Sequence, residues 1–84
     1  MGWNRIQATK SGNRHPLLND VPERAHVYFV HSYFAEMSAD TIASCEYFEP
    51  FTAIVGNGNF MGCQFHPERS GSVGEQILRN FLAL

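Results

Sequence analysis

The strongest strand signal in the chain is HVYFVHSYF, at residues 26–34. Aromatic and β-branched side chains dominate this stretch, which is typical of β-strands. Apolar side chains fall on both alternating faces, so a strand built from residues 27–34 needs cover on both sides. We therefore expect a strand inside a layered protein rather than a hairpin with one face in water.

The segments on either side of this strand predict turns and shorter strands. Residues 1–24 contain many turn formers and are expected to be mostly loop, with at most one short strand near residues 3–9. The Asn57-Gly58 pair predicts a tight hairpin turn, because both residue types tolerate positive φ. Further strands are expected at residues 41–48, 51–55 and 60–65.

The end of the chain predicts a helix. Ser72 and Glu75 fit a capping box at its start. Val73, Ile77 and Phe81 lie four residues apart and form an apolar stripe, with Leu78 and Leu82 beside it. The polar face is expected to comprise Glu75, Gln76, Arg79 and Asn80. Periodicity alone thus favours a small antiparallel β-meander followed by a C-terminal helix.

Length and composition exclude several classes of protein. The chain has 84 residues, 44% of them hydrophobic and 13% aromatic, so one folded domain is the upper limit. Six Lys and Arg against eight Asp and Glu give a net charge of −2, which argues against a nucleic-acid partner. There is no run of about 18 apolar residues, which argues against a membrane span. Without a secretory signal or a disulfide framework from Cys45 and Cys63, we expect a cytoplasmic protein.

The most informative chemistry lies in QFHPERS, residues 64–70. Side chains at i and i+2 of an extended segment point the same way, so His66 and Glu68 are expected to lie together. Pro67 keeps His66 out of the helical region. A carboxylate that orients an imidazole leaves the second ring nitrogen to exchange protons, as in catalytic triads. The alternative is a surface ion pair beside a turn, with little energetic effect.

Neither cysteine fits the nucleophile that this pair lacks. Cys63 lies three residues before His66, so strand alternation places it on the opposite face, where it is expected to pack as a small buried hydrophobic residue. Cys45 lacks the flanking glycines of a nucleophile elbow. His26 and His31 face opposite sides of one strand, so no metal site is expected.

The segment Gln64–Glu68 resembles the C-terminal signature of class I glutamine amidotransferases. Within that family, the branch that serves histidine biosynthesis is most similar, at residues 1–4, 15–17, 28–33 and 60–64. The resemblance covers essentially the whole chain but less than half of the family's domain. It implies that residues 1–84 are the C-terminal portion of a single three-layer α/β domain of flavodoxin-like type, with locally antiparallel strands and a C-terminal helix. We prefer this fold to the meander, because the strand at 27–34 needs cover on both faces.

The resemblance also implies roles for particular residues. His66 and Glu68 match two members of a Cys-His-Glu triad, whose Cys is expected before Met1, so this chain alone should be inactive. Arg69 stands where the family often has Lys, which keeps the charge but changes the donor geometry. No metal or other cofactor is implied, and ammonia from glutamine would pass to a (β/α)8-barrel cyclase subunit. The implied glutamine pocket contains His31, Ser32 and Tyr33, and the implied partner interface contains Trp3, Asn4, Tyr28 and Arg69.

Two other functions remain open at this stage. A glutaminase that serves another synthase, of anthranilate or carbamoyl phosphate type, would share Gln64–Glu68, although residues 1–4 and 28–33 favour the histidine pathway. A non-catalytic interaction module that kept the signature without the nucleophile is the third hypothesis.

Overall fold

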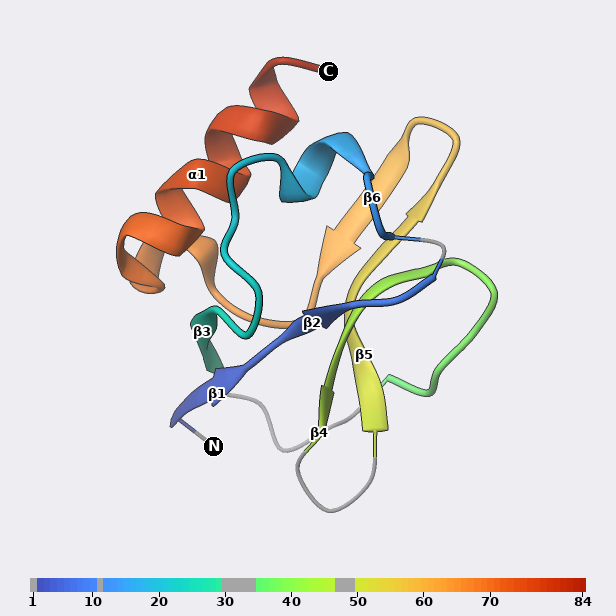
Figure 1. Cartoon of the computed structure of the whole chain (residues 1–84), viewed down its shortest axis with the longest axis horizontal. Helices are drawn as coiled ribbons and strands as arrows, with labels where there is room; N and C mark the ends of the chain where they lie inside the picture. Colours follow the sequence, from blue (N-terminus) through green and yellow to red (C-terminus); the bar gives the residue numbers. More distant parts are fainter. Residues whose placement is uncertain (1, 11, 30–34, 47–49) are drawn as a thin grey trace.

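The computed structural model describes residues 2–10, 12–29, 35–46 and 50–84 of the chain (Figure 1). The described residues form six strands, two short 3-10 helices and one α-helix. The strands are β1 (Gly2–Arg5), β2 (Gln7–Ala8), β3 (His26–Phe29), β4 (Thr41–Glu46), β5 (Pro50–Asn57) and β6 (Phe60–Cys63). The helical segments are η1 (Pro16–Leu18), η2 (Pro67–Arg69) and α1 (Gly71–Leu82).

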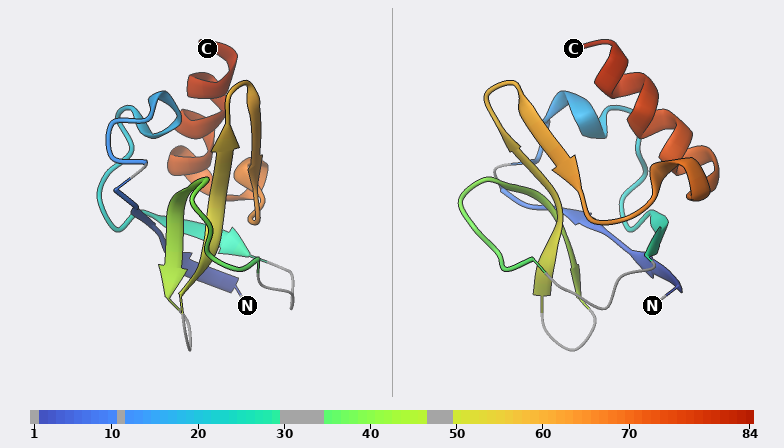
Figure 2. Two further views of the ribbon diagram at one scale, coloured as in Figure 1. Left: turned by 90° about the vertical axis from the view of Figure 1, so that its right-hand side faces the viewer. Right: turned by 180° about the vertical axis from the view of Figure 1, so that it is seen from behind.

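The strands form two sheets. One contains β1 and β3, and the other has the order β2-β4-β5-β6. Every pairing between these strands is antiparallel, which confirms the predicted local arrangement, and β4, β5 and β6 follow one another as a meander. Helix α1 runs along one side of the molecule beside η1 (Figure 2). The described part of the chain is therefore a mixed α and β structure.

The predicted strand at residues 26–34 is confirmed as β3 over His26–Phe29, and residues 30–34 lie outside the described residues. Val27 and Phe29 are almost fully buried. His26 is exposed and Tyr28 is only half-buried, because their face lies outside the core. The expectation that both faces are covered is therefore wrong for the described part of this strand in this chain.

The strands that are buried on both faces are β4 and β5 instead. Residues 41–45 and 51–54 are buried at every position, and β4 and β5 are the two inner strands of the four-stranded sheet. The two sheets meet at Phe29, whose ring packs edge-on against Phe51 and Phe65 at centroid distances of 5.4 and 5.8 Å. This aromatic cluster fixes β3 beside the segment that follows β6.

The hairpin turn is confirmed, one residue later than predicted. Asn57, the last residue of β5, pairs with Phe60, the first residue of β6, so Gly58 and Asn59 are the central residues of the turn. Gly58 has a φ of 62°, and glycine at the first central position is the pattern of a type II′ turn.

The C-terminal helix is confirmed, but its start differs from the prediction. Helix α1 begins at Gly71, and Ser70 occupies the N-cap position without a capping hydrogen bond from its side chain. The capping box of Ser72 and Glu75 is therefore wrong. Val73 and Ile77 pack on the core, whereas Phe81 remains half exposed.

Asn80 was predicted on the polar face of this helix, and that prediction is wrong. The residue is buried, and its Nδ2 donates to the backbone oxygens of Leu17 and Asn19 at 2.8 and 2.7 Å. Its Oδ1 accepts from Gln76 Nε2 at 3.0 Å. Asn80 thus ties α1 to the end of η1, where the carbonyl groups would otherwise lack donors.

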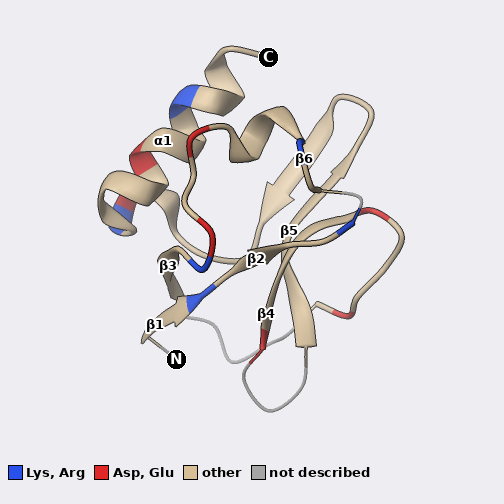
Figure 3. Cartoon of the chain, in the orientation of Figure 1, with Lys and Arg blue, Asp and Glu red and all other residues tan. Residues whose placement is uncertain are grey.

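Charged residues of both signs are interspersed along the described chain (Figure 3). None of the helices in the described part is long and apolar enough to cross a membrane.

Asn80→Asp tests the contact between α1 and η1. The substitution keeps the shape of the side chain but replaces the donor Nδ2 with a carboxylate oxygen, which cannot donate to the two backbone carbonyls. We expect the free energy of unfolding to fall by about 2–4 kcal/mol, because buried acceptors are left without donors. Urea unfolding followed by Trp3 fluorescence measures the loss. Asn59→Asp, at an exposed turn position, is the control, and equal losses in the two variants would contradict the assignment.

Candidate active site

The candidate site lies where the chain leaves the four-stranded sheet and crosses to β3. Gln64 still donates its backbone N–H to Ala53 in β5, at 2.8 Å. Two residues later, His66 donates its backbone N–H to the carbonyl of Tyr28 in β3, at 3.0 Å. Phe65 lies between them, buried against Phe29. The crossing therefore places His66 beside β3 through a direct backbone contact.

His66 and Glu68 form the pair that the sequence predicts. Nδ1 of His66 lies 2.9 Å from Oε1 of Glu68. Pro67 begins the 3-10 turn η2, so Glu68 lies in that turn rather than in the extended segment expected, while His66 itself is extended with φ −96° and ψ 101°. With the carboxylate accepting from Nδ1–H, the second ring nitrogen, Nε2, is the one that can exchange protons.

The environment of the pair decides what it can contribute. The side chains of His66 and Glu68 are 34% and 58% exposed, so the ion pair adds little to stability. Nε2 of His66 is nevertheless shielded from solvent. The arrangement therefore suits orientation of the imidazole better than stabilisation of the fold.

Helix α1 supports η2 through an unusually close backbone approach. The first turn of α1 follows η2 directly, and Gly74 N–H donates to the Ser70 carbonyl at 3.1 Å. A side chain at Gly74 would overlap with the carbonyl oxygen of Pro67. Glycine is thus required at residue 74 by space, since any larger residue pushes η2 and Glu68 away from the helix.

Two of the predicted interface residues lie together. Trp3 and Tyr28 are register partners in β1 and β3, and their rings make an edge contact with centroids 5.7 Å apart. Trp3 is 53% exposed. Because Tyr28 also accepts the hydrogen bond from His66, this aromatic surface adjoins the segment that carries the candidate catalytic pair. Arg69 is exposed on η2.

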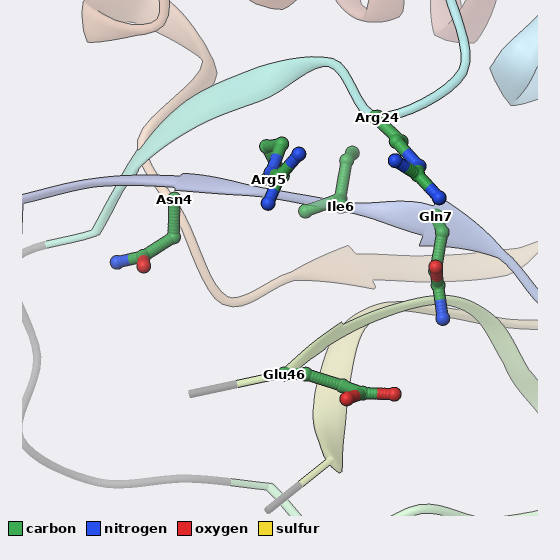
Figure 4. A pocket seen from close by; sticks show the side chains of 6 residues that line it. All are labelled: Asn4, Arg5, Ile6, Gln7, Arg24 and Glu46. Carbon is green, nitrogen blue, oxygen red and sulfur yellow. The ribbon is translucent and has the colours of Figure 1, made fainter. Parts of the chain in front are cut away.

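Asn4, the remaining predicted interface residue, lines a polar pocket of about 420 Å³ (Figure 4). The pocket gathers side chains from the β1–β2 region, from the turn before β3 and from the end of β4. Its charged groups are of both signs, so it defines no simple anion or cation site. The lining residues are Asn4, Arg5, Ile6, Gln7, Arg24 and Glu46.

His31, Ser32 and Tyr33, predicted to line a glutamine pocket, lie outside the described residues. Among the residues that the structure does describe, no group of three or more His, Cys, Asp or Glu side chains could hold a metal ion.

Both cysteines favour the protonated thiol. Burial raises the pKa of Cys45, and the nearby Glu46 carboxylate raises it further. Cys63 is exposed as a residue, which differs from the buried position expected, and it lines an apolar groove between β6 and α1. Desolvation of its thiol and the charge of Glu68 both raise the pKa of Cys63. Neither thiol has the lowered pKa of an activated nucleophile.

Sequence reasoning missed two supporting residues, Ser70 and Gly74. Ser70 is buried behind η2, and Gly74 contacts the Pro67 carbonyl. Both residues act through contacts that depend on the packing of α1, so the sequence alone does not reveal them. The only available signal was that they follow the signature at Gln64–Glu68 closely in the sequence.

Comparison with known proteins identifies the family of the chain. All 84 residues match the sequence model of the glutamine amidotransferase class-I family, so the chain belongs to that family. Its similar relatives include subunits of imidazole glycerol phosphate synthase from several bacteria. The imidazole glycerol phosphate synthase subunit HisH of Shewanella sediminis is 54% identical over the whole chain, which covers 37% of that protein.

The corresponding subunits of Shewanella oneidensis and Salmonella typhimurium are 51% and 52% identical over the whole chain. The chain covers 38% and 41% of these two proteins. It therefore spans only about two fifths of the length of the curated relatives that it matches.

Gly74→Ala tests the contact between α1 and η2. Alanine in a helix interior normally stabilises by roughly 0.5–1 kcal/mol relative to glycine. Here we expect the opposite, a loss of about 1–3 kcal/mol in the free energy of unfolding, because the methyl group overlaps with a backbone oxygen. Gly62→Ala is the control, since its methyl group would lie 3.6 Å from Val55 in ordinary contact. Thermal unfolding measures both, and a more stable Gly74→Ala variant would refute the close approach.

The raised pKa of Cys63 predicts slow alkylation. Iodoacetamide reacts with thiolate, so the rate at Cys63 should rise at a higher pH than that of an unfolded cysteine peptide. Glu68→Gln should move this midpoint down only in part, because desolvation remains, and Glu75→Gln should not move it. Peptide mapping by mass spectrometry separates Cys63 from Cys45. A midpoint below that of the free peptide would contradict this environment and make Cys63 a candidate nucleophile.

Proposed function

We propose that this chain is the C-terminal portion of the glutaminase subunit of an imidazole glycerol phosphate synthase. The observation that carries the proposal is the His66–Glu68 pair, at 2.9 Å, in a chain whose whole length is about half identical to that subunit in several bacteria. Glutamine is the proposed substrate, and glutamate and ammonia are the proposed products. A (β/α)8-barrel cyclase subunit would take up the ammonia in histidine biosynthesis, in the cytoplasm.

In the proposed mechanism, a cysteine thiolate attacks the side-chain amide of glutamine and forms a thioester. His66 gives a proton to the departing ammonia, then takes one from the water that hydrolyses the thioester. Glu68 holds the imidazole in the tautomer with the proton on Nδ1. The nucleophile would come from a part of the subunit outside residues 1–84, since neither Cys45 nor Cys63 has the required pKa. No cofactor takes part in these steps.

The proposed glutamine pocket includes His31, Ser32 and Tyr33. These residues follow β3 directly in the sequence, and β3 is hydrogen-bonded to His66 through Tyr28. Strand β3 ends at Phe29, one residue after the Tyr28 carbonyl that accepts the His66 hydrogen bond, so the chain enters residues 31–33 from a point beside the candidate catalytic histidine. This proximity supports the proposed role of the segment in binding glutamine.

The proposed cyclase interface comprises Trp3, Asn4, Tyr28 and Arg69. Exposed aromatic rings and arginine are enriched where proteins bind one another. Trp3, half exposed and packed edge-on against Tyr28, has this character. In the complete domain, we propose, further elements complete the three-layer arrangement.

The alternatives are weaker. A glutaminase of an anthranilate or carbamoyl phosphate synthase would share the His66–Glu68 pair, but the relatives that match this chain at 51–54% identity are named for imidazole glycerol phosphate synthase. A non-catalytic module would keep the pair without turnover, so catalysis separates it from both glutaminases.

The test uses a full-length subunit bearing this segment, purified with its cyclase partner. We expect glutamate release from glutamine to fall at least about 1,000-fold in His66→Ala and roughly 100-fold or more in Glu68→Gln. Glu75→Gln, an exposed carboxylate paired with Arg79, should change little. The 84-residue chain alone should release no glutamate.

Growth separates the pathways. The full-length gene should restore a histidine auxotroph that lacks its own glutaminase subunit, and not a tryptophan or arginine auxotroph. Full activity in His66→Ala, or rescue of only the other auxotrophs, would refute the proposal.

A further inference from the structure

Ser70 joins three segments through one hydroxyl group. The residue lies between η2 and α1 and is 1% exposed. Its Oγ accepts a hydrogen bond from the backbone N–H of Tyr28 at 2.9 Å. The same oxygen donates to the backbone carbonyl of His66 at 2.6 Å. A buried hydroxyl thus connects β3 to the residue that carries the candidate catalytic imidazole.

The hydroxyl completes a modified β-bridge between Tyr28 and His66. In a regular antiparallel pair, two facing residues exchange both of their N–H···O=C hydrogen bonds. Here His66 donates directly to Tyr28, at 3.0 Å. The return bond, from Tyr28 N–H to the His66 carbonyl, is relayed through Ser70 Oγ. The inserted oxygen therefore sets how far the His66 backbone stands from β3.

Only a small hydroxyl side chain meets these requirements. The relay needs a group that accepts and donates at the same time, which serine and threonine can do and alanine cannot. The Ser70 Cβ packs closely on Gly74, where an added Cβ would come within 2.9 Å of it. The relay also explains why Ser70, although at the N-cap position of α1, makes no capping hydrogen bond from its side chain.

We propose that Ser70 is a positioning residue that holds His66, and with it the His66–Glu68 contact, at the distance from β3 that catalysis requires. The catalytic consequence rests on the proposed glutaminase function, whereas the structural relay does not. Without the hydroxyl, Tyr28 N–H and the His66 carbonyl can pair directly or take up water. Either change moves the His66 backbone and alters the contact between Nδ1 and Glu68.

The test compares Ser70→Ala, Ser70→Thr and Ser70→Cys with the control Ser72→Ala, an exposed serine two residues further along the chain. All four are made in the full-length subunit and measured with its partner, at a temperature where each is folded. Two quantities are measured: the kinetic constants for glutamine, and the ¹⁵N chemical shifts of the His66 ring, which report which nitrogen holds the proton.

In Ser70→Ala, we expect kcat to fall at least about tenfold with KM changed less than about twofold, because the displaced group acts in the chemical step. The ring nitrogen shifts should change in the same variant. Ser70→Thr should restore both quantities. If the added methyl group of threonine prevents folding, Ser70→Cys, a weak donor and acceptor of similar size, should give intermediate values of both.

A merely structural role would lower the unfolding temperature of Ser70→Ala and leave kcat and the ring shifts of the folded protein unchanged, which would overturn the proposal. Equal effects in Ser72→Ala would also overturn it. If the unsubstituted subunit releases no glutamate, the proposed function fails, and the ring nitrogen shifts alone then decide whether Ser70 positions His66.

Discussion

The backbone hydrogen bond from His66 to Tyr28, 3.0 Å long, is the contact on which the rest of the site depends. The chain is hydrogen-bonded to the four-stranded sheet at Gln64 and to β3 at His66, two residues later. Phe65 makes this crossing stable, because its buried ring packs against Phe29, which also packs against Phe51. A directed polar contact is thus held in place by an apolar cluster, which excludes the water that would otherwise compete for it.

The site combines a solvent-exposed carboxylate, which contacts the imidazole, with buried groups, which fix the backbone. The Glu68 carboxylate is more than half exposed, so its contact with the imidazole of His66 costs little desolvation. The backbone that carries both residues is fixed by buried groups, namely Ser70 and the close contact of Gly74 with Pro67. Family membership gives this arrangement its chemical meaning, since an exposed His-Glu pair alone would also fit an ordinary surface ion pair.

Sequence reasoning succeeded where the signal was local. The hairpin before Phe60, the presence of a C-terminal helix and the pairing of His66 with Glu68 all follow from turn residues, periodicity or spacing. It failed where burial depends on distant segments. Asn80 looked like a residue of the solvated face, yet two carbonyl groups near η1 hold it in the interior. Strand β3 looked covered on both sides, yet the described chain covers only the face of Val27 and Phe29.

The sequence by itself determined the family and the two residues that face each other, because the signature at Gln64–Glu68 and the i, i+2 spacing are local properties of the chain. Only the tertiary structure decided how that pair is held. Tyr28 and Ser70 are separated by 42 positions in sequence, and a hydroxyl becomes a link between them only when α1 packs beside β3. Serine is common at solvent-exposed positions, so the residue type alone does not predict a buried hydrogen-bonded link. The link forms only when packing shields the hydroxyl group from water.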